Sequence, residues 1–167
     1  MDLGLTDKVI IVTGGAKGIG EGIVKALAKE GAIPFIVGRD EEDNLKCIQD
    51  VESAGGRVSQ VVAELTDPEQ CEKAVKAVIK QYGRIDGLVN NAGVNDGVGL
   101  ETGDYQKFMA SLHKNVVHYY LVAHYALPEL KRSQGAIVNI TSKTADTGQG
   151  NTSAYAASNG ARKVRNL

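Results

Sequence analysis

The chain has 167 residues, 43% of them hydrophobic, and its 19 basic residues nearly balance 20 acidic ones for a formal net charge of -1. A chain of this length can bury a sizeable core, and we expect one domain over residues 1–167. Balanced charge gives no electrostatic reason to expect nucleic acid or an anionic membrane as a partner, which leaves small molecules. Because no apolar run reaches membrane-spanning length and no basic segment precedes an apolar one at the N-terminus, we expect a cytoplasmic protein.

The cysteines and histidines do not suggest a metal site. Cys47 and Cys71 lie in predicted helices without redox or metal-ligand spacing, which is typical of free thiols in a reducing compartment. His113, His118 and His124 fall on one predicted helix with no carboxylate or cysteine companion at ligand spacing. We therefore expect no metal.

The most informative stretch of the chain begins with four consecutive apolar residues, Val9–Val12, which predict a parallel strand buried on both faces. Gly14, Gly18 and Gly20 follow, and an amphipathic helix then runs to Gly31. Such glycines let the backbone turn tightly and approach a bulky anion, and the helix N-terminus offers free N–H groups. The stretch predicts a site for a dinucleotide pyrophosphate, although close packing of a helix on a sheet calls for similar glycines.

The end of the next predicted strand, Ala32–Val37, bears on the choice of dinucleotide. A free ribose 2′-hydroxyl is usually held by a carboxylate at this strand tip, whereas a 2′-phosphate calls for a guanidinium. Here Arg39 follows the tip, and Lys17 in the glycine turn adds a second cation on the same side. Both favour NADP over NAD. The alternative is that these cations are merely solvated and Asp40 holds the ribose, so NAD stays possible.

The remaining pattern alternates strands and helices with short links. The further elements that we expect are a helix over Asp43–Ala54, a strand over Val58–Ala63, a helix capped at Asp67-Pro68 and ending at Tyr82, a strand over Ile85–Asn90, a helix over Asp104–Leu127 closed by Pro128, a strand over Gly135–Ile140, a polar loop over Lys143–Thr152 and a helix from near Ser153. This alternation predicts a Rossmann-like α/β fold with a doubly wound parallel sheet.

The ends of the later strands carry further candidate residues. Glu64 and Leu65 are placed to flank an adenine, and the carboxamides of Asn90-Asn91 are placed to tie neighbouring strand ends together. Gly93 permits close approach of a ligand. The expected cofactor-binding residues are Gly14, Lys17, Gly18, Ile19, Gly20, Arg39, Glu64, Leu65, Asn91, Ala92 and Gly93.

These motifs together resemble the short-chain dehydrogenase/reductase family. The residues that carry the resemblance are Thr13-Gly14-x-x-x-Gly18-x-Gly20, Asn90-Asn91-Ala92-Gly93, Asn115, Ser142 and Tyr155, which stand in the family's order and cover nearly the whole chain. Within the family, the segments from Asn90 to Gly99 and from Ser142 to Tyr155 look most like the L-fucose dehydrogenase type. The resemblance implies a dehydrogenase that uses a nicotinamide cofactor, and family members usually oligomerise, so a homo-oligomer is expected.

The resemblance also implies a catalytic set. Tyr155 would take the proton of a substrate hydroxyl, Ser142 would hydrogen-bond the same oxygen, and Asn115 would position a water in the proton relay. A tyrosine has a reference pKa of about 10, and the family lowers it with a lysine four residues later. Here that residue is Asn159, so the set reads Asn115, Ser142, Tyr155 and Asn159.

The loss of this lysine predicts weak turnover. One cation about 4 Å away at an effective dielectric of about 20 is worth roughly 4 kcal/mol, or about three pKa units. Lys163 would lie about 12 Å from Tyr155, too far to replace it. Asn159 would still be able to hydrogen-bond a ribose hydroxyl. We expect cofactor binding to be retained in part and turnover to be strongly reduced.

Two functions follow from these observations. The leading one is an oxidoreductase that transfers hydride between NADP(H) and a secondary alcohol or ketone of a small polar substrate, for example a sugar such as L-fucose; the alternative is a catalytically inactive, truncated dinucleotide-binding fragment. Family members continue with two more strands, so the C-terminal strands are expected to be missing and the fifth strand to form a sheet edge. The residues that suit a hydroxyl-rich ligand, although solvent exposure explains them equally well, are Asn95, Asp96, Lys143, Gln149 and Asn151.

Overall fold

The computed structural model describes residues 1–163 and contains a parallel sheet of five strands in the order β3-β2-β1-β4-β5. The strands are β1 (Val9–Thr13), β2 (Ile33–Gly38), β3 (Ser59–Val62), β4 (Gly87–Asn90) and β5 (Ala136–Asn139). All four pairings are parallel, and each strand lies within two residues of its predicted bounds. The predicted doubly wound α/β fold is confirmed.

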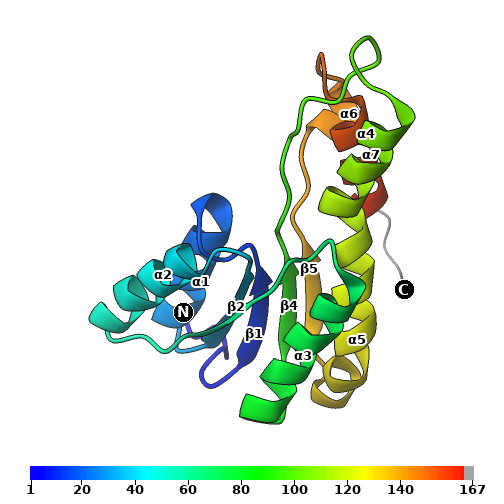
Figure 1. Cartoon of the computed structure of the whole chain (residues 1–167). Coiled ribbons are helices and arrows are strands. Elements are labelled where there is room, and N and C mark those ends of the chain that lie inside the picture. Colours follow the sequence, from blue (N-terminus) through cyan, green and yellow to red (C-terminus); the bar gives the residue numbers. More distant parts are fainter. Residues whose placement is uncertain (164–167) are drawn as a thin grey trace.

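Helices cover both faces of the sheet (Figure 1). The helices are α1 (Gly18–Lys29), α2 (Glu41–Ser53), α3 (Pro68–Tyr82), α4 (Tyr105–Leu112), the π-helix η1 (His113–Val117), α5 (His118–Ser133), α6 (Thr144–Thr147) and α7 (Ser153–Lys163). Helices α1 and α2 pack on one face, and α3 and α5 pack on the other. Within residues 1–163, no helix combines the length and the apolar character that crossing a membrane requires.

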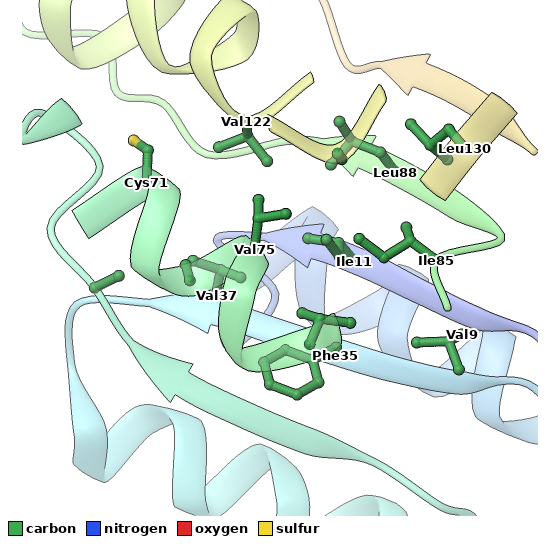
Figure 2. Packing of buried hydrophobic residues seen from close by; sticks show 14 of the residues in the cluster. Val9, Ile11, Phe35, Val37, Cys71, Val75, Ile85, Leu88, Val122 and Leu130 are labelled. Atoms are coloured by element: carbon green, nitrogen blue, oxygen red, sulfur yellow. The ribbon is translucent and has the colours of Figure 1, made fainter. Parts of the chain in front are cut away.

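Strand β1 contributes to both layers of the core, as its unbroken apolar run predicts. Val9 and Ile11 point into the larger cluster, between the sheet and the pair α3 and α5, where Figure 2 shows Ile11 beside Val75. Ile10 and Val12 point into the opposite cluster, under α1 and α2. Because side chains alternate across a strand, four consecutive apolar residues supply two to each face.

Acidic caps and glycines set the helix boundaries, and the sequence predicts two of them, the cap at Asp67 and the ending at Gly31. Asp40, Asp67 and Asp104 each accept a backbone N–H at the start of α2, α3 and α4. Gly31 and Gly83 follow α1 and α3 with φ values of 82° and 68°, which a residue without a Cβ adopts without strain.

The expected helix over Asp104–Leu127 is wrong in two respects. It is divided by the π-helix η1, and it does not end at Pro128 but continues to Ser133. Packing outweighs the hydrogen bond that proline cannot donate, because the next turn buries Leu130 in the larger core.

The C-terminal part of the sheet is the least covered. The expected polar loop over Lys143–Thr152 contains the short helix α6. All four residues of β5 are exposed, and Ile137 and Val138 are among the exposed large hydrophobic residues. Strand β5 therefore forms the expected edge of the described sheet.

Candidate active site

A cavity of about 610 Å³ lies where the carboxyl ends of all five strands meet. In open α/β sheets this end is where ligands bind. The lining residues are Gly14, Lys17, Ile19, Val37, Gly38, Arg39, Ala63, Glu64, Leu65, Thr66, Asn91, Ala92, Gly93, Val94, Lys114, His118, Ile140, Thr141, Ser142, Tyr155 and Arg162. The expected site residues that do not line it are Gly18, Gly20, Asn115 and Asn159. None of the five polar residues considered for a hydroxyl-rich ligand lines it either.

The glycine turn forms one wall of this cavity. Gly14 and Gly18 have φ values of 62° and 55°, and a Cβ on Gly20 would lie 2.1 Å from the carbonyl oxygen of Gly14. The turn therefore needs glycine at position 20 because the backbone passes too closely for any side chain. Around Gly18 a Cβ would have open space, so its need for glycine is conformational.

Helix α1 begins at this turn without a side-chain cap. Its N-cap residue, Lys17, makes no capping hydrogen bond, unlike the aspartates that cap α2, α3 and α4. The first N–H groups of an α-helix have no partner within the helix, and here the positive end of the helix dipole meets the cavity. These features fit a bound phosphate group.

Hydrogen bonds from Asn91 hold the glycine turn against the end of β4. Its side-chain Nδ2 donates to the carbonyl oxygens of Thr13 at 3.0 Å and Gly14 at 3.1 Å. The hydroxyl oxygen of Thr13 accepts the backbone N–H groups of Asn91 at 2.9 Å and Ala92 at 3.1 Å. This is the tie between strand ends that the asparagine pair predicts.

A side chain at the tip of β2 would have to displace the side chain of Asn44. A Cβ on Gly38 would lie 2.5 Å from Oδ1 of Asn44, whose amide group donates to the Gly38 carbonyl at 3.2 Å. The nearby Asp40 carboxylate is used to cap α2, accepting the N–H of Asp43 at 3.0 Å. No carboxylate can therefore project from position 38, and the one at position 40 is already bonded.

The two cations at this edge are exposed and paired. Lys17 Nζ lies 2.5 Å from an Asp43 carboxylate oxygen, and this hydrogen bond raises the pKa of Lys17. Arg39 lies 3.7 Å from Glu64. Burial of Glu64 acts to raise its pKa, but hydrogen bonds from Thr66 and the charge of Arg39 lower it overall. Because such exposed pairs are weak, both cations can turn to an incoming phosphate.

Ser142 and Tyr155 line the opposite wall of the cavity, after β5 and on α7. The Ser142 oxygen accepts the N–H of Thr144 at 3.3 Å, so its O–H remains a donor toward the cavity. The α6 helix that begins at Thr144 thus orients the serine hydroxyl.

Asn115 lies behind this wall, fully buried in η1. Its Oδ1 accepts the backbone N–H of Val94 at 2.7 Å, and its Nδ2 donates to the Ser111 carbonyl at 3.0 Å. Its own carbonyl oxygen accepts Nε of Arg162 at 2.5 Å. Asn115 thus fixes the loop after β4 to η1 and α7.

Asn159 does not line the cavity in this structure, and its bond to a cofactor ribose stays a prediction. Its side chain is fully buried, donates to the Tyr155 carbonyl at 2.8 Å and accepts from Nη1 of Arg162 at 3.0 Å. Being shorter than lysine, asparagine satisfies its polar atoms on its own helix.

Arg162 is the functional candidate that sequence reasoning missed. The expected positions for a cation are four and eight residues after Tyr155, yet a residue seven positions on lies about 20° from the same helix face. Arg162 lines the cavity and is 6% exposed, whereas Lys163 is exposed and pairs with Asp146. The helical period was the signal that could have found it.

Two further residues of α5 lie beside this group. Burial lowers the pKa of His118 to about 4 and raises the pKa of Tyr119 to about 12. His118 bonds the Lys114 carbonyl through Nε2, and the Tyr119 hydroxyl donates to the Ile140 carbonyl at 3.2 Å.

Across residues 1–163, no three His, Cys, Asp or Glu side chains form a possible set of metal ligands.

The sequence matches the short chain dehydrogenase family over residues 8–164, and the chain belongs to that family. Among curated relatives, it is 39% identical over 141 residues to a 7alpha-hydroxysteroid dehydrogenase of Clostridium sardiniense, covering 82% of this chain and 54% of that protein. It is 35% identical over 155 residues to an L-fucose dehydrogenase of Bos taurus, covering 92% of this chain and 56% of the relative. The chain thus spans just over half the length of these relatives.

Solved structures of the same family share the fold. The Cj0485 dehydrogenase is 44% identical, with a TM-score of 0.88 over 97% of this chain and 62% of that one. A metagenomic short-chain oxidoreductase in complex with NADP is 29% identical, with a TM-score of 0.87 over 93% of this chain and 71% of that one.

Proposed function

We propose that the protein is an oxidoreductase that transfers hydride between NADP(H) and a secondary alcohol or ketone of a small polar substrate. The observation that carries this proposal is a single cavity lined both by the glycine turn and by Ser142 and Tyr155. One wall fits a pyrophosphate, and the other presents a phenol and a hydroxyl. A dinucleotide bound along the strand ends would extend from the first wall toward the second.

Oxidation of the alcohol would break its O–H and C–H bonds, and the proton and the hydride would go to different acceptors. The proton of the hydroxyl passes to the phenolate oxygen of Tyr155, while Ser142 donates a hydrogen bond to the same substrate oxygen. When bound, the nicotinamide supplies the hydride acceptor and is reduced as the alcohol becomes a carbonyl. Reduction of a ketone runs through the same contacts in reverse.

The β2 tip supports NADP over NAD. A ribose 2′-hydroxyl is usually held by a carboxylate from this position, and Asn44 fills the space that a side chain on Gly38 would need. Asp40 is used as a helix cap. Lys17 and Arg39, in contrast, line the cavity and suit a 2′-phosphate.

The substrate that we propose is a sugar such as L-fucose. Support comes from the similarity to L-fucose dehydrogenase over 92% of this chain. Because the chain is also similar to a steroid dehydrogenase, a hydroxysteroid is the second candidate substrate to assay.

The first experiment measures binding and turnover separately. Calorimetry with NADP and with NAD on the 167-residue chain is expected to give tighter binding of NADP, and L-fucose is expected to produce NADPH. Tyr155→Phe should retain cofactor binding and lower the rate by about 100- to 10,000-fold, the usual contribution of acid–base catalysis. Tyr120→Phe is the matched control, since Tyr120 is exposed and outside the cavity.

Each outcome selects between the candidate functions. NADP binding without turnover of L-fucose or a 7α-hydroxysteroid would favour a catalytically inactive dinucleotide-binding chain. Equal rates for parent and Tyr155→Phe would remove Tyr155 from the mechanism. Tighter NAD than NADP binding would overturn the assignment of the β2 tip.

A further inference from the structure

A buried guanidinium beside the catalytic wall has no anionic partner in the described chain. Arg162 is 6% exposed and is bonded to oxygens of Asn115, Ile140 and Asn159. These are carbonyl and amide oxygens, so within residues 1–163 the guanidinium has hydrogen bonds but no carboxylate. Burying a cation without an anion is unfavourable, which makes the guanidinium a strong attractor for any negative charge that forms nearby.

The nearest groups that can become negative are two phenols, and only one of them faces the cavity. The Arg162 Cζ atom lies 4.3 Å from the centre of the Tyr119 ring and 6.0 Å from the centre of the Tyr155 ring. Tyr119 is buried, and its hydroxyl already donates to a backbone carbonyl. Tyr155 lines the cavity. The charge of Arg162 is therefore available to a phenolate at Tyr155.

Helix geometry explains how Arg162 reaches this position. Helical side chains point back toward the N-terminus, and a residue seven positions later returns to nearly the same face. Lys163 is rotated by about 80° from that face, and its ammonium pairs with Asp146 at the surface. The long arginine side chain thus extends back along α7, where it donates to Oδ1 of Asn159 at 3.0 Å.

The surrounding backbone is shaped around this guanidinium. A Cβ on Gly93 would lie 2.7 Å from Nη2 of Arg162 and 2.9 Å from Oδ1 of Asn115. The loop after β4 therefore approaches Arg162 closely only because residue 93 has no side chain. Four hydrogen bonds from its three nitrogens then fix the orientation of the guanidinium.

We propose that Arg162 supplies the positive charge that stabilises the Tyr155 phenolate, in place of a cation at position 159. This inference rests on the proposed function, because the phenolate is the proposed proton acceptor. It is an alternative to the expectation from the sequence that Asn159 leaves the tyrosine without a cation. Arg162 is a positioning residue that acts through Tyr155, and arginine keeps its charge at every pH of the assay.

Other groups packed around this cluster do not interfere with the test. His118 and Tyr119 on α5 have pKa values of about 4 and about 12, so neither titrates between pH 6 and pH 10. Lys114 on η1 is half-exposed and pairs with Asp96. The charge of Glu64, beyond the end of β3, acts to raise the pKa of His118 but is outweighed by burial. Burial lowers the pKa of Arg162, opposed by the charges of the two phenols.

The test is a spectroscopic titration of phenolate absorbance, which needs neither cofactor nor turnover. The chain has six tyrosines, so the signal of Tyr155 is taken as the difference between each protein and its Tyr155→Phe counterpart. Removal of the charge in Arg162→Gln should move this ionisation upward, because a positive charge near the Tyr155 ring favours the phenolate. Arg162→Lys, which keeps a charge, should move it less.

Two further variants separate charge from structure. Adding Asn159→Lys to Arg162→Gln is expected to return the ionisation toward its original midpoint, because the lysine restores a cation near the phenol. Lys163→Gln is the matched control, since it removes an equal charge from the exposed face of the same helix turn. Circular dichroism and NADP calorimetry identify any variant that has lost its fold or its cofactor site.

The outcomes distinguish this inference from the proposed function. An equal shift in Lys163→Gln, or no shift in Arg162→Gln, overturns the role of Arg162 whether or not the protein turns over a substrate. If Arg162→Gln does not fold, Arg162→Lys is compared with the parent chain: an upward shift of the ionisation, from a shorter side chain that holds its charge farther from the ring, supports the role, and an unshifted ionisation refutes it. Absence of NADP binding by the unsubstituted chain would count against the proposed function but not against the role of Arg162.

Discussion

The two walls of the cavity are built in different ways. The wall formed by β1, α1 and β2 consists mainly of backbone: positive φ angles at Gly14 and Gly18, a helix start without a side-chain cap, and a Gly38 tip closed to side chains. The wall formed by η1, β5 and α7 consists of side chains, with Asn115 and Arg162 joined across 47 residues of sequence. The shape of the first wall therefore depends on backbone geometry, whereas the shape of the second depends on contacts between side chains.

The largest expected effect is on the free energy of unfolding, and it differs between the strands beneath the two walls, β1 and β5. Ile11 on β1 is 0% exposed, whereas Ile137 on β5 is 44% exposed. Ile11→Ala should lower the free energy of unfolding by about 2–5 kcal/mol through lost burial and a cavity, and Ile137→Ala by less than about 1 kcal/mol. Denaturant unfolding measures both changes.

Each substitution is the control for the other, because both remove the same side-chain atoms from a strand. Similar losses for Ile11→Ala and Ile137→Ala would mean that β5 is covered in solution, for example by a second copy of the chain. The contrast between a buried β1 and an exposed β5 would then not hold in solution.

A smaller effect is expected from crowding the glycine turn. A Cβ in Gly20→Ala would lie 2.1 Å from the Gly14 carbonyl oxygen, so the backbone must shift. Strain of this kind amounts to about 1–3 kcal/mol, and we expect NADP to bind roughly 10- to 100-fold more weakly by calorimetry. Gly22→Ala, in the same helix with open space around the added atom, should bind NADP as the parent does and gain up to about 1 kcal/mol of stability. Unchanged binding in Gly20→Ala would show that the turn tolerates a shift and does not hold the phosphate.

The first wall could be predicted from sequence because its determinants are local. The apolar run Val9–Val12, the glycines after it and the cap at Asp67 act within one element or one turn, and the structure has these elements within two residues of their predicted bounds. Parallel pairing then brings the strand ends together in one place.

The second wall could be predicted only in part because its contacts are long-range. Ser142 and Tyr155 were predicted through the family resemblance, but the entry of Arg162 depends on side-chain length, on helix rotation and on the space left by Gly93. The π-helix at η1 and the continuation of α5 past Pro128 likewise depend on burial of distant residues, which no local pattern reports.

Asp86 joins the amino ends of β1 and β4, on the far edge of the sheet from the cavity, and its removal should have the smallest of these effects. Its carboxylate accepts the backbone N–H of Val9 at 2.9 Å and two hydrogen bonds from Arg84, at 2.8 Å and 2.5 Å. Burial acts to raise the pKa of Asp86, but the hydrogen bonds from Arg84 and Val9 outweigh it and lower the pKa overall. Because Arg84 is half-exposed, we expect Asp86→Asn to lower the free energy of unfolding by only about 1 kcal/mol.

The pH dependence of that loss distinguishes an ionic tie from a purely structural one. The folded-state pKa of Asp86 lies below the unfolded value of about 3.9, so its contribution is fully present above about pH 5 and disappears as pH falls through the folded value. Denaturant unfolding of the parent and Asp86→Asn should therefore differ at pH 7 and converge toward pH 3. Asp7→Asn is the control: it removes an exposed ion pair with Arg57 at a φ of 61°, which asparagine also adopts, and should change stability by less than about 0.5 kcal/mol. A difference for Asp86→Asn that persists unchanged at pH 3 would mean that the carboxylate charge does not hold β1 to β4.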